Sequence, residues 1–273
     1  METAVTLSAD SLGVWLDGRH VLRDPAVAQG VDHALRTRRA VVLGNVALDA
    51  DGFVALAALL GELRPTRVRH PSLGTDAGQY IFVSAHNGQA GAARKEDAGH
   101  IWHHDYTFAM PLPRLSLLYG VNPPPGGSCN GFVDLAAAYS ALPHALKQQA
   151  DTLSAWHYPH PQGVDDLPAQ SRAAVPWDLR NQGTLHPLVG RDTAGTPFLC
   201  LPAHHDSGVQ GLDEGASAVL LGDLWRHALA SGRSWDYELA KGEILIWDNQ
   251  ALAHRRSPWP IDKERLLWFI STK

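Results

Sequence analysis

The stretch Ile244-Leu-Ile-Trp-Asp-Asn-Gln-Ala-Leu-Ala-His254, followed by Leu266-Leu-Trp-Phe-Ile270, indicates how this chain folds. Both stretches contain a short run of apolar, β-branched or aromatic residues, which is typical of a buried strand. Strand-like runs dominate the second half of the sequence, and helical patterns lie before and between them. We therefore predict a mainly β (α+β) fold, with a jelly-roll core and flanking helices.

The rest of the sequence supplies further elements. Helices are predicted over 31–39, 53–60, 135–142 and 216–230, and strands over 40–43, 79–85 and 115–121. Stretches rich in Gly or Pro predict a loop at 88–99, a turn at 122–127 and an irregular insertion at 157–180. The loop at 88–99 directly precedes the first chemical motif, where a lid would be useful.

Length and composition limit the class of protein. The 273 residues are 45% hydrophobic and 19% charged, which fits a single globular domain over 1–273. No apolar run approaches the roughly 18 residues of a membrane span, and no secretory signal is visible, so we expect a cytoplasmic protein with no membrane partner. The net charge is −5 and there is no basic run, so we expect no nucleic-acid partner. Homo-oligomerisation is left open.

The sharpest local feature is Trp102-His103-His104-Asp105. Side chains two apart in an extended segment point to the same side, so His103 and Asp105 can reach one metal while His104 points away. His254 is the candidate third ligand. Two histidines and one carboxylate form the facial triad of non-haem iron sites, with positions left for a 2-oxo acid and dioxygen. A lone His-x-Asp is more often only solvated or hydrogen-bonded.

An arginine eleven residues after His254 strengthens the metal hypothesis. Arg265 begins the last apolar strand, and an arginine that points inward there is costly unless it meets an anion. Its planar fork suits a carboxylate, such as the distal carboxylate of 2-oxoglutarate. The alternative is a salt bridge to Asp262 or Glu264 near the surface.

Taken together, these motifs resemble the taurine dioxygenase-like family, from about residue 40 to the C-terminus. The resemblance rests on Trp102-His-His-Asp-Tyr-Thr-Phe108, the Pro-Gly-Gly turn ending at Gly127, Trp247-Asp-Asn249 and the spacing of His254 to Arg265. Weaker matches are Leu60-Gly-Glu-Leu63, His186-Pro-Leu-Val189 and Gly211-Leu212.

The resemblance implies a double-stranded β-helix, Fe²⁺, and 2-oxoglutarate and O2 as co-substrates. It implies that His103, Asp105 and His254 are the metal ligands and catalytic centre, and that Arg265 binds the co-substrate. The expected reaction is hydroxylation of an unactivated C–H bond of a small-molecule substrate. Desaturation, ring formation and C–heteroatom cleavage remain alternatives. Asp105 argues against chlorination, because halogenating relatives carry a small residue there.

The sequence departs from this family at both binding sites. Cys129 stands where a threonine often holds the co-substrate, and Asn130 is the alternative contact. Phe269 replaces the arginine that grips the sulfonate of taurine, although His70 is kept. We therefore expect His70, Tyr106 and Phe269 to bind a substrate other than taurine, such as an amino acid, nucleoside or natural-product intermediate.

Other polar residues near the motifs are weaker candidates, for which a surface or structural role is as plausible: His86, Asn87, His104, Arg255 and Arg256. Asp248 and Asn249 are expected to fix the turn that aims His254. A non-catalytic jelly-roll module that binds a metal or ligand is the alternative of another class. Zinc-dependent hydrolysis is a third reading, but it gives Arg265 no role.

Overall fold

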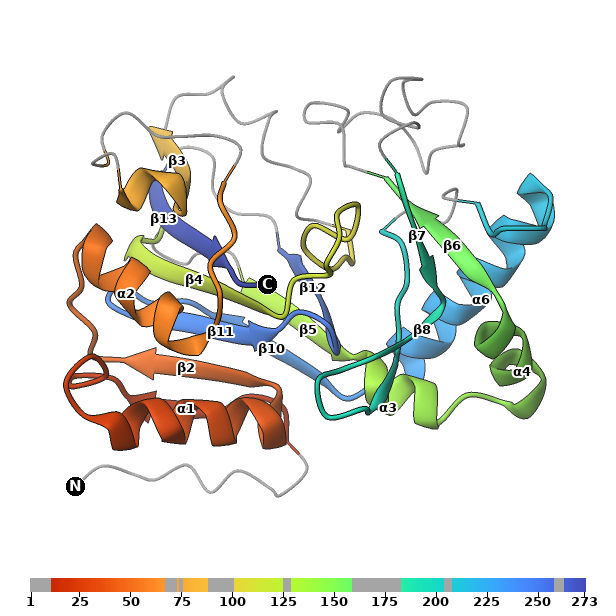
Figure 1. Ribbon diagram of the computed structural model, residues 1–273, viewed down its shortest axis with the longest axis horizontal. Helices are drawn as coiled ribbons and strands as arrows, with labels where there is room; N and C mark the ends of the chain where they lie inside the picture. The colour runs from red at the N-terminus through yellow and green to blue at the C-terminus, as the bar shows by residue number, and fades with distance from the viewer. Residues whose placement is uncertain are drawn as a thin grey trace.

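The computed structural model describes residues 11–66, 73, 76–87, 101–124, 129–158, 183–203, 208–257 and 263–273. These residues form a strand-rich molecule with helices on its outside (Figure 1). The helices are α1 (Pro25–Arg38), α2 (Ala50–Leu60), α3 (Leu135–Ser140), α4 (His144–Thr152) and α6 (Glu214–Ser231), with a short 3-10 helix η1 (Ala77–Gln79). None of the helices in these ranges is both long and apolar enough to cross a lipid bilayer.

Two sheets form the centre of the described part of the chain. The larger has the order β1 (Trp15–Asp17), β2 (Ala40–Gly44), β11 (Ile244–Asp248), β4 (Leu115–Asn122), β13 (Glu264–Ser271) and β3 (Phe82–Asn87). The smaller has the order β10 (Ser234–Glu238), β5 (Cys129–Asp134) and β12 (Leu252–Arg256). Only the β1–β2 pair is parallel within these two sheets. Two further pairs are β6 (Ser154–His157) with β7 (Thr184–Pro187), and β8 (Val189–Arg191) with β9 (Pro197–Leu199).

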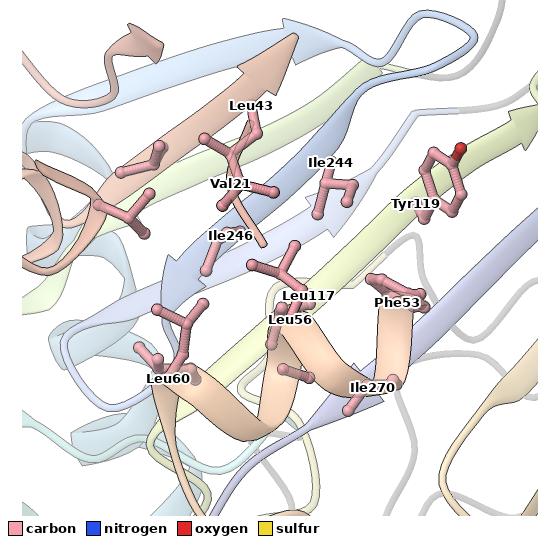
Figure 2. Packing of buried hydrophobic residues seen from close by; sticks show 14 of the residues in the cluster. Val21, Leu43, Phe53, Leu56, Leu60, Leu117, Tyr119, Ile244, Ile246 and Ile270 are labelled. Atoms are coloured by element: carbon pink, nitrogen blue, oxygen red, sulfur yellow. The ribbon is translucent and has the colours of Figure 1, made fainter. Parts of the chain in front are cut away.

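Helices α1 and α2 cover one face of the larger sheet. Figure 2 shows Phe53 and Leu56 of α2 packed toward Leu117 and Ile246 on the strands, and all four side chains are fully buried. The ring of Phe53 lies 5.5 Å from that of Tyr119. Each such buried side chain stabilises the fold by about 1.5–3 kcal/mol. This core holds the larger sheet but contains none of the predicted site residues.

A second core lies between the two sheets. Val42, Leu245 and Leu267 of the larger sheet join Phe132 and Leu252 of the smaller sheet in one buried cluster. A third cluster packs α3 and α6 against the other face of the smaller sheet. The order of layers is therefore helices, larger sheet, smaller sheet, helices, and the predicted metal ligands lie where the two sheets face each other.

Most predicted elements are present, with corrected bounds. The helices predicted at 31–39 and 53–60 begin earlier, because Asp24 and Asp49 cap them by accepting hydrogen bonds from backbone N–H groups. The helix predicted over 135–142 ends at residue 140, since Pro143 disfavours a helical conformation of the residue before it. The strand predicted at 79–85 begins later, and 77–79 form η1 instead.

One correction concerns the site. His254 lies within β12, a strand that the sequence did not predict. Strands β1, β5, β6, β7, β8, β9 and β10 were also not predicted. The predicted loop at 88–99, residues 125–127 of the predicted turn, most of the insertion at 157–180, and His70 lie outside the described residues.

Candidate metal centre

His103, Asp105 and His254 come together between the sheets. The segment of His103 pairs with β12: the His103 N–H donates to the His254 carbonyl at 3.0 Å, and the His254 N–H donates to the His103 carbonyl at 2.8 Å. Oδ1 of Asp105 lies 3.8 Å from Nε2 of His103 and 3.6 Å from Nε2 of His254. One potential ligand atom from each residue lies within 4.8 Å of the others. The predicted convergence is therefore present.

Nε2 of each histidine faces Asp105. Nδ1 of His103 lies 2.8 Å from the carbonyl oxygen of Ile101, which it meets as a donor, so its Nε2 keeps the lone pair. Burial, reinforced by neighbouring His103 and His104, lowers the pKa of His254 well below its usual range. The imidazole of His254 is therefore uncharged at neutral pH, as a metal ligand must be.

The carboxylate of Asp105 is oriented by Ser116. The hydroxyl of Ser116 donates to Oδ2 of Asp105 at 2.6 Å, which leaves Oδ1 facing the histidines. Burial raises the pKa of Asp105, whereas His103 and the Ser116 hydrogen bond lower it. A carboxylate largely removed from water is costly without a neighbouring positive charge, and a divalent cation supplies one. This donor set fits Fe²⁺.

His104 points away from that centre, as expected. Its Nδ1 lies 2.8 Å from the carbonyl oxygen of Asn249, and its ring packs near that of Phe198. Burial lowers the pKa of His104 to about 4, so it is a neutral donor to the Asn249 carbonyl.

A cavity of about 370 Å³ opens from these three residues. Its other lining residues are Phe82, Ser84, Ile101, His104, Tyr106, Thr107, Phe108, Leu118, Asn130, Tyr158, Ala203, Trp247, Arg256, Arg265 and Phe269. The structure thus brings Arg265, Asn130, Tyr106 and Phe269 to one cavity with the candidate ligands. Of these wall residues, Phe82, Ser84, Ile101, Leu118, Tyr158 and Ala203 were not singled out from the sequence.

Arg265 lies at the wall of the cavity and not at the surface. Its side chain is buried, and Nη1 donates to the hydroxyl of Ser84. Glu264, the nearest sequence candidate for a surface salt bridge, is exposed and precedes Arg265 in β13, so the two side chains point to opposite faces. This placement favours the anion-binding interpretation over the surface pair.

Cys129 and Asn130 are consecutive in β5 and face opposite ways. Asn130 is buried and lines the cavity, whereas Cys129 is half-buried and is not among the lining residues. Burial raises the pKa of the Cys129 thiol. Of the two predicted alternatives, Asn130 is the residue placed for a contact with a molecule in the cavity.

Asp248 acts as expected, while Asn249 differs from the prediction. Oδ1 of Asp248 accepts the N–H groups of Gln250 and Ala251 in the turn before β12. Asn249 instead holds Asp105: its Oδ1 accepts the Asp105 N–H at 2.8 Å, and its Nδ2 donates to the Asp105 carbonyl at 3.1 Å. No local signal in the sequence links these two residues, which are 144 positions apart.

Comparison with known proteins agrees with this geometry. The model of the "Taurine catabolism dioxygenase TauD, TfdA family" matches residues 5–270. The chain belongs to this family. It is a 2-oxoglutarate-dependent non-haem iron dioxygenase, with Fe²⁺ as cofactor and 2-oxoglutarate and O2 as co-substrates. Family membership thus decides against both zinc-dependent hydrolysis and a non-catalytic module.

Individual relatives cover nearly the whole chain. An alpha-ketoglutarate-dependent 2,4-dichlorophenoxyacetate dioxygenase of Cupriavidus pinatubonensis is 28% identical over 269 residues, which are 92% of this chain and 90% of the relative. The crystal structure of a taurine dioxygenase from Burkholderia xenovorans has a TM-score of 0.74 at 27% identity, covering 96% of this chain and 85% of its own. The structure of AAD-2 with Mn(II) and N-oxalylglycine has a TM-score of 0.78 at 18% identity, covering 96% and 94% of the two chains.

Proposed function

We propose that His103, Asp105 and His254 hold the iron, that Arg265 binds the distal carboxylate of 2-oxoglutarate, and that the enzyme hydroxylates a C–H bond of a small molecule. The supporting observation is the convergence of three ligand atoms at one cavity with a buried guanidinium in its wall. We further propose that 1–273 form one domain whose facing sheets are a double-stranded β-helix, or jelly roll. The cytoplasmic location stays a prediction.

The chain's own residues have defined tasks in this reaction. The bound iron and its co-substrates supply the oxidising power. Ser116 holds Asp105 by one oxygen, and Ile101 sets the tautomer of His103, so both ligands are oriented before the metal binds. Arg265, steadied by Ser84, provides the fork for a carboxylate, and Asn130 adds a polar side chain to the same cavity.

The remaining wall favours a substrate with an apolar face. Tyr106 and Phe269 lie with ring centroids 6.2 Å apart, and Phe269 lies 6.3 Å from Trp247. Phe269 offers neither a charge nor a hydrogen bond to a sulfonate. A charged hydrogen bond contributes about 1.5–3 kcal/mol, so its absence disfavours taurine. The relatives named above act on different molecules, and we propose an amino acid, nucleoside or natural-product intermediate as the substrate class.

Succinate formation tests the proposal. The enzyme with Fe²⁺, O2 and 2-oxoglutarate is given a panel of candidate small molecules, and the true substrate should stimulate succinate formation and be converted to a product of different mass. A gain of one oxygen indicates hydroxylation, whereas a loss of two hydrogens indicates desaturation or ring formation. His103→Ala and His254→Ala should abolish Mn²⁺ binding, while Arg255→Met, at an exposed position of β12, should not. Retained Mn²⁺ affinity in both alanine variants would contradict the ligand assignment.

A further inference from the structure

The turn over residues 105–108 links the metal centre to the cavity wall. It begins at Asp105 and carries Tyr106 and Phe108, which both line the cavity. Tyr106 has a φ of 52°, in the left-handed region that side-chain-bearing residues rarely adopt. Such a conformation persists only when the surrounding structure holds it. The groups that hold this turn therefore decide the shape of the wall.

Tyr106 and Phe108 separate two hollows. Both residues also line a second cavity, of about 280 Å³, together with Arg64 and Met110 among others. The guanidinium carbon of Arg64 lies 5.5 Å from the centre of the Tyr106 ring, and Phe269 packs 6.2 Å from the same ring in the metal cavity. If this wall moved, the space available to a substrate beside the metal would change.

One anchor fixes the first residue of the turn. The side-chain amide of Asn249 bonds both the N–H and the carbonyl of Asp105, as described above. Asn249 is fully buried, and its own carbonyl accepts the hydrogen bond from His104. The backbone of Asp105 is thereby fixed by the segment that leads into β12.

A second anchor, from β7, fixes the end of the turn. Nε2 of His186 donates to the carbonyl of Thr107 at 2.7 Å, and the hydroxyl of Thr184 donates to the carbonyl of Phe108 at 2.6 Å. Thr184 and His186 are two apart in a strand, so they lie on the same face of β7. The carbonyls of two successive residues in the turn thus accept hydrogen bonds from β7, which belongs to neither the larger nor the smaller sheet.

His186 donates its hydrogen bond to the Thr107 carbonyl at any physiological pH. Burial lowers the pKa of His186, so the ring is neutral at physiological pH. The Thr107 carbonyl can only accept a hydrogen bond, which places the single proton of the neutral ring on Nε2. The ring of His157 in β6 packs edge-on at 4.9 Å and limits rotation of His186. His186 therefore donates to the turn across the physiological pH range.

We propose that Thr184 and His186 are positioning residues that hold Tyr106 and Phe108 as the substrate wall, and that Asn249 separately holds Asp105 for the metal. The inference rests on the metal site proposed above. Only the backbone of Tyr106 and Thr107 lies between the two anchors. Release of the β7 anchor lets Tyr106 relax to a negative φ and displaces the wall, while Asp105 stays bonded to Asn249.

Two measurements on the full chain separate the anchors. Exchange of the Ala109 amide, which bonds the Tyr106 carbonyl at 3.0 Å, reports on the turn by deuterium uptake and mass spectrometry. Calorimetric titration with Mn²⁺ reports on Asp105. The variants are the near-isosteric pair Thr184→Val with His186→Phe, and Asn249→Asp, which replaces a donor by an acceptor.

The pair of β7 substitutions should accelerate exchange around Ala109 by roughly tenfold or more, because two hydrogen bonds are lost, with little effect on Mn²⁺ affinity. Asn249→Asp should weaken Mn²⁺ binding by roughly 10- to 100-fold, the usual effect of removing a group that orients a ligand. Thr184→Ser keeps the hydroxyl and should exchange like the wild type, whereas Thr184→Val alone should not.

Three results would overturn the inference. Unchanged exchange at Ala109 in the β7 pair means that the strand does not hold the turn. Equal acceleration over the whole chain means that the two residues only stabilise the fold. Loss of Mn²⁺ affinity in the β7 pair as large as in Asn249→Asp means that the anchors are not separate. If wild-type protein binds no Mn²⁺, the metal-site proposal fails, and exchange at Ala109 still decides the role of β7.

Discussion

Replacing Arg265 should weaken the binding of 2-oxoglutarate, and the size of the effect follows from the burial of Arg265 and the hydrogen bonds that are lost. The side chain is 6% exposed and lines the cavity, so a carboxylate bound there is shielded from water. Arg265→Lys keeps the charge but loses one of two parallel bonds, which costs about 1.5–3 kcal/mol and weakens binding roughly 10- to 150-fold. Arg265→Met leaves the carboxylate without a partner, which costs about 2–5 kcal/mol and weakens binding roughly 30- to 5,000-fold.

The assay is calorimetric titration of N-oxalylglycine, which has both carboxylates of 2-oxoglutarate, into Mn²⁺-loaded enzyme. The matched control is Arg255→Met, because the guanidinium of Arg255 lies 4.6 Å from the centre of the Trp102 ring and its residue is exposed. The control should bind the analogue as the wild type does. A Kd of Arg265→Met within threefold of the wild-type value would refute the assignment of Arg265, and a Kd of Arg265→Lys within threefold of the wild-type value would refute the bidentate fork.

Three further predictions concern stability and reactivity. Arg39→Met leaves two largely buried carboxylates, Asp192 and Asp248, without their shared guanidinium at 2.7 and 2.8 Å, and should lower the free energy of unfolding in urea by about 3–5 kcal/mol. His157→Phe should raise it by about 1–2 kcal/mol, because the ring nitrogens of the buried His157 make no hydrogen bond of good geometry among the described residues, although the backbone of Cys200 lies near. Burial raises the pKa of Cys200 to about 12, so its thiol should react with Ellman's reagent at pH 8 only after unfolding.

Each of these has a control within the chain. Arg36→Met removes an exposed ion pair and should change stability by less than about 1 kcal/mol, so an equal loss in Arg39→Met would contradict the first prediction. His227→Phe should destabilise, since His227 lies 3.1 Å from the Ala138 carbonyl; destabilisation by His157→Phe as well would contradict the second. Native Cys129, which is half-buried, should react before Cys200, and the reverse order would contradict the third.

The fold was predictable where a strand is buried on both faces. Strand β2 reads Ala40-Val-Val-Leu-Gly44, and every one of its residues is buried, so its apolar run is visible without any knowledge of the sheet. Strands β4, β11 and β13 were found in the same way. The smaller sheet was not found, because β5 begins with Cys129-Asn-Gly131, which looks like a turn.

The site was predictable where chemistry and spacing are local. The alternation of side chains placed His103 and Asp105 on one side, and the structure brings both to His254. Between Cys129 and Asn130, which a single sequence left open, the geometry favours Asn130, because it lies on the face of β5 that lines the cavity. The contacts that hold the 103–108 segment were not predictable, because Asn249 bonds Asp105, and His186 bonds Thr107, from positions far along the chain.

The polar residues His254 and Arg256 of β12, which made this strand of the smaller sheet hard to predict from sequence, also line the cavity. In β12, Leu252, His254 and Arg256 alternate toward the interior: the first joins the core between the sheets, and the other two line the cavity. A strand that must place an imidazole and a guanidinium at one cavity cannot also show a continuous apolar run. The apolar run that is typical of a buried strand is therefore absent from β12, because residues on its inner face line the cavity. It follows that the placement of His254 depends on pairing with β5 and with the His103 segment, both distant in sequence, and not on the local propensity of its own strand.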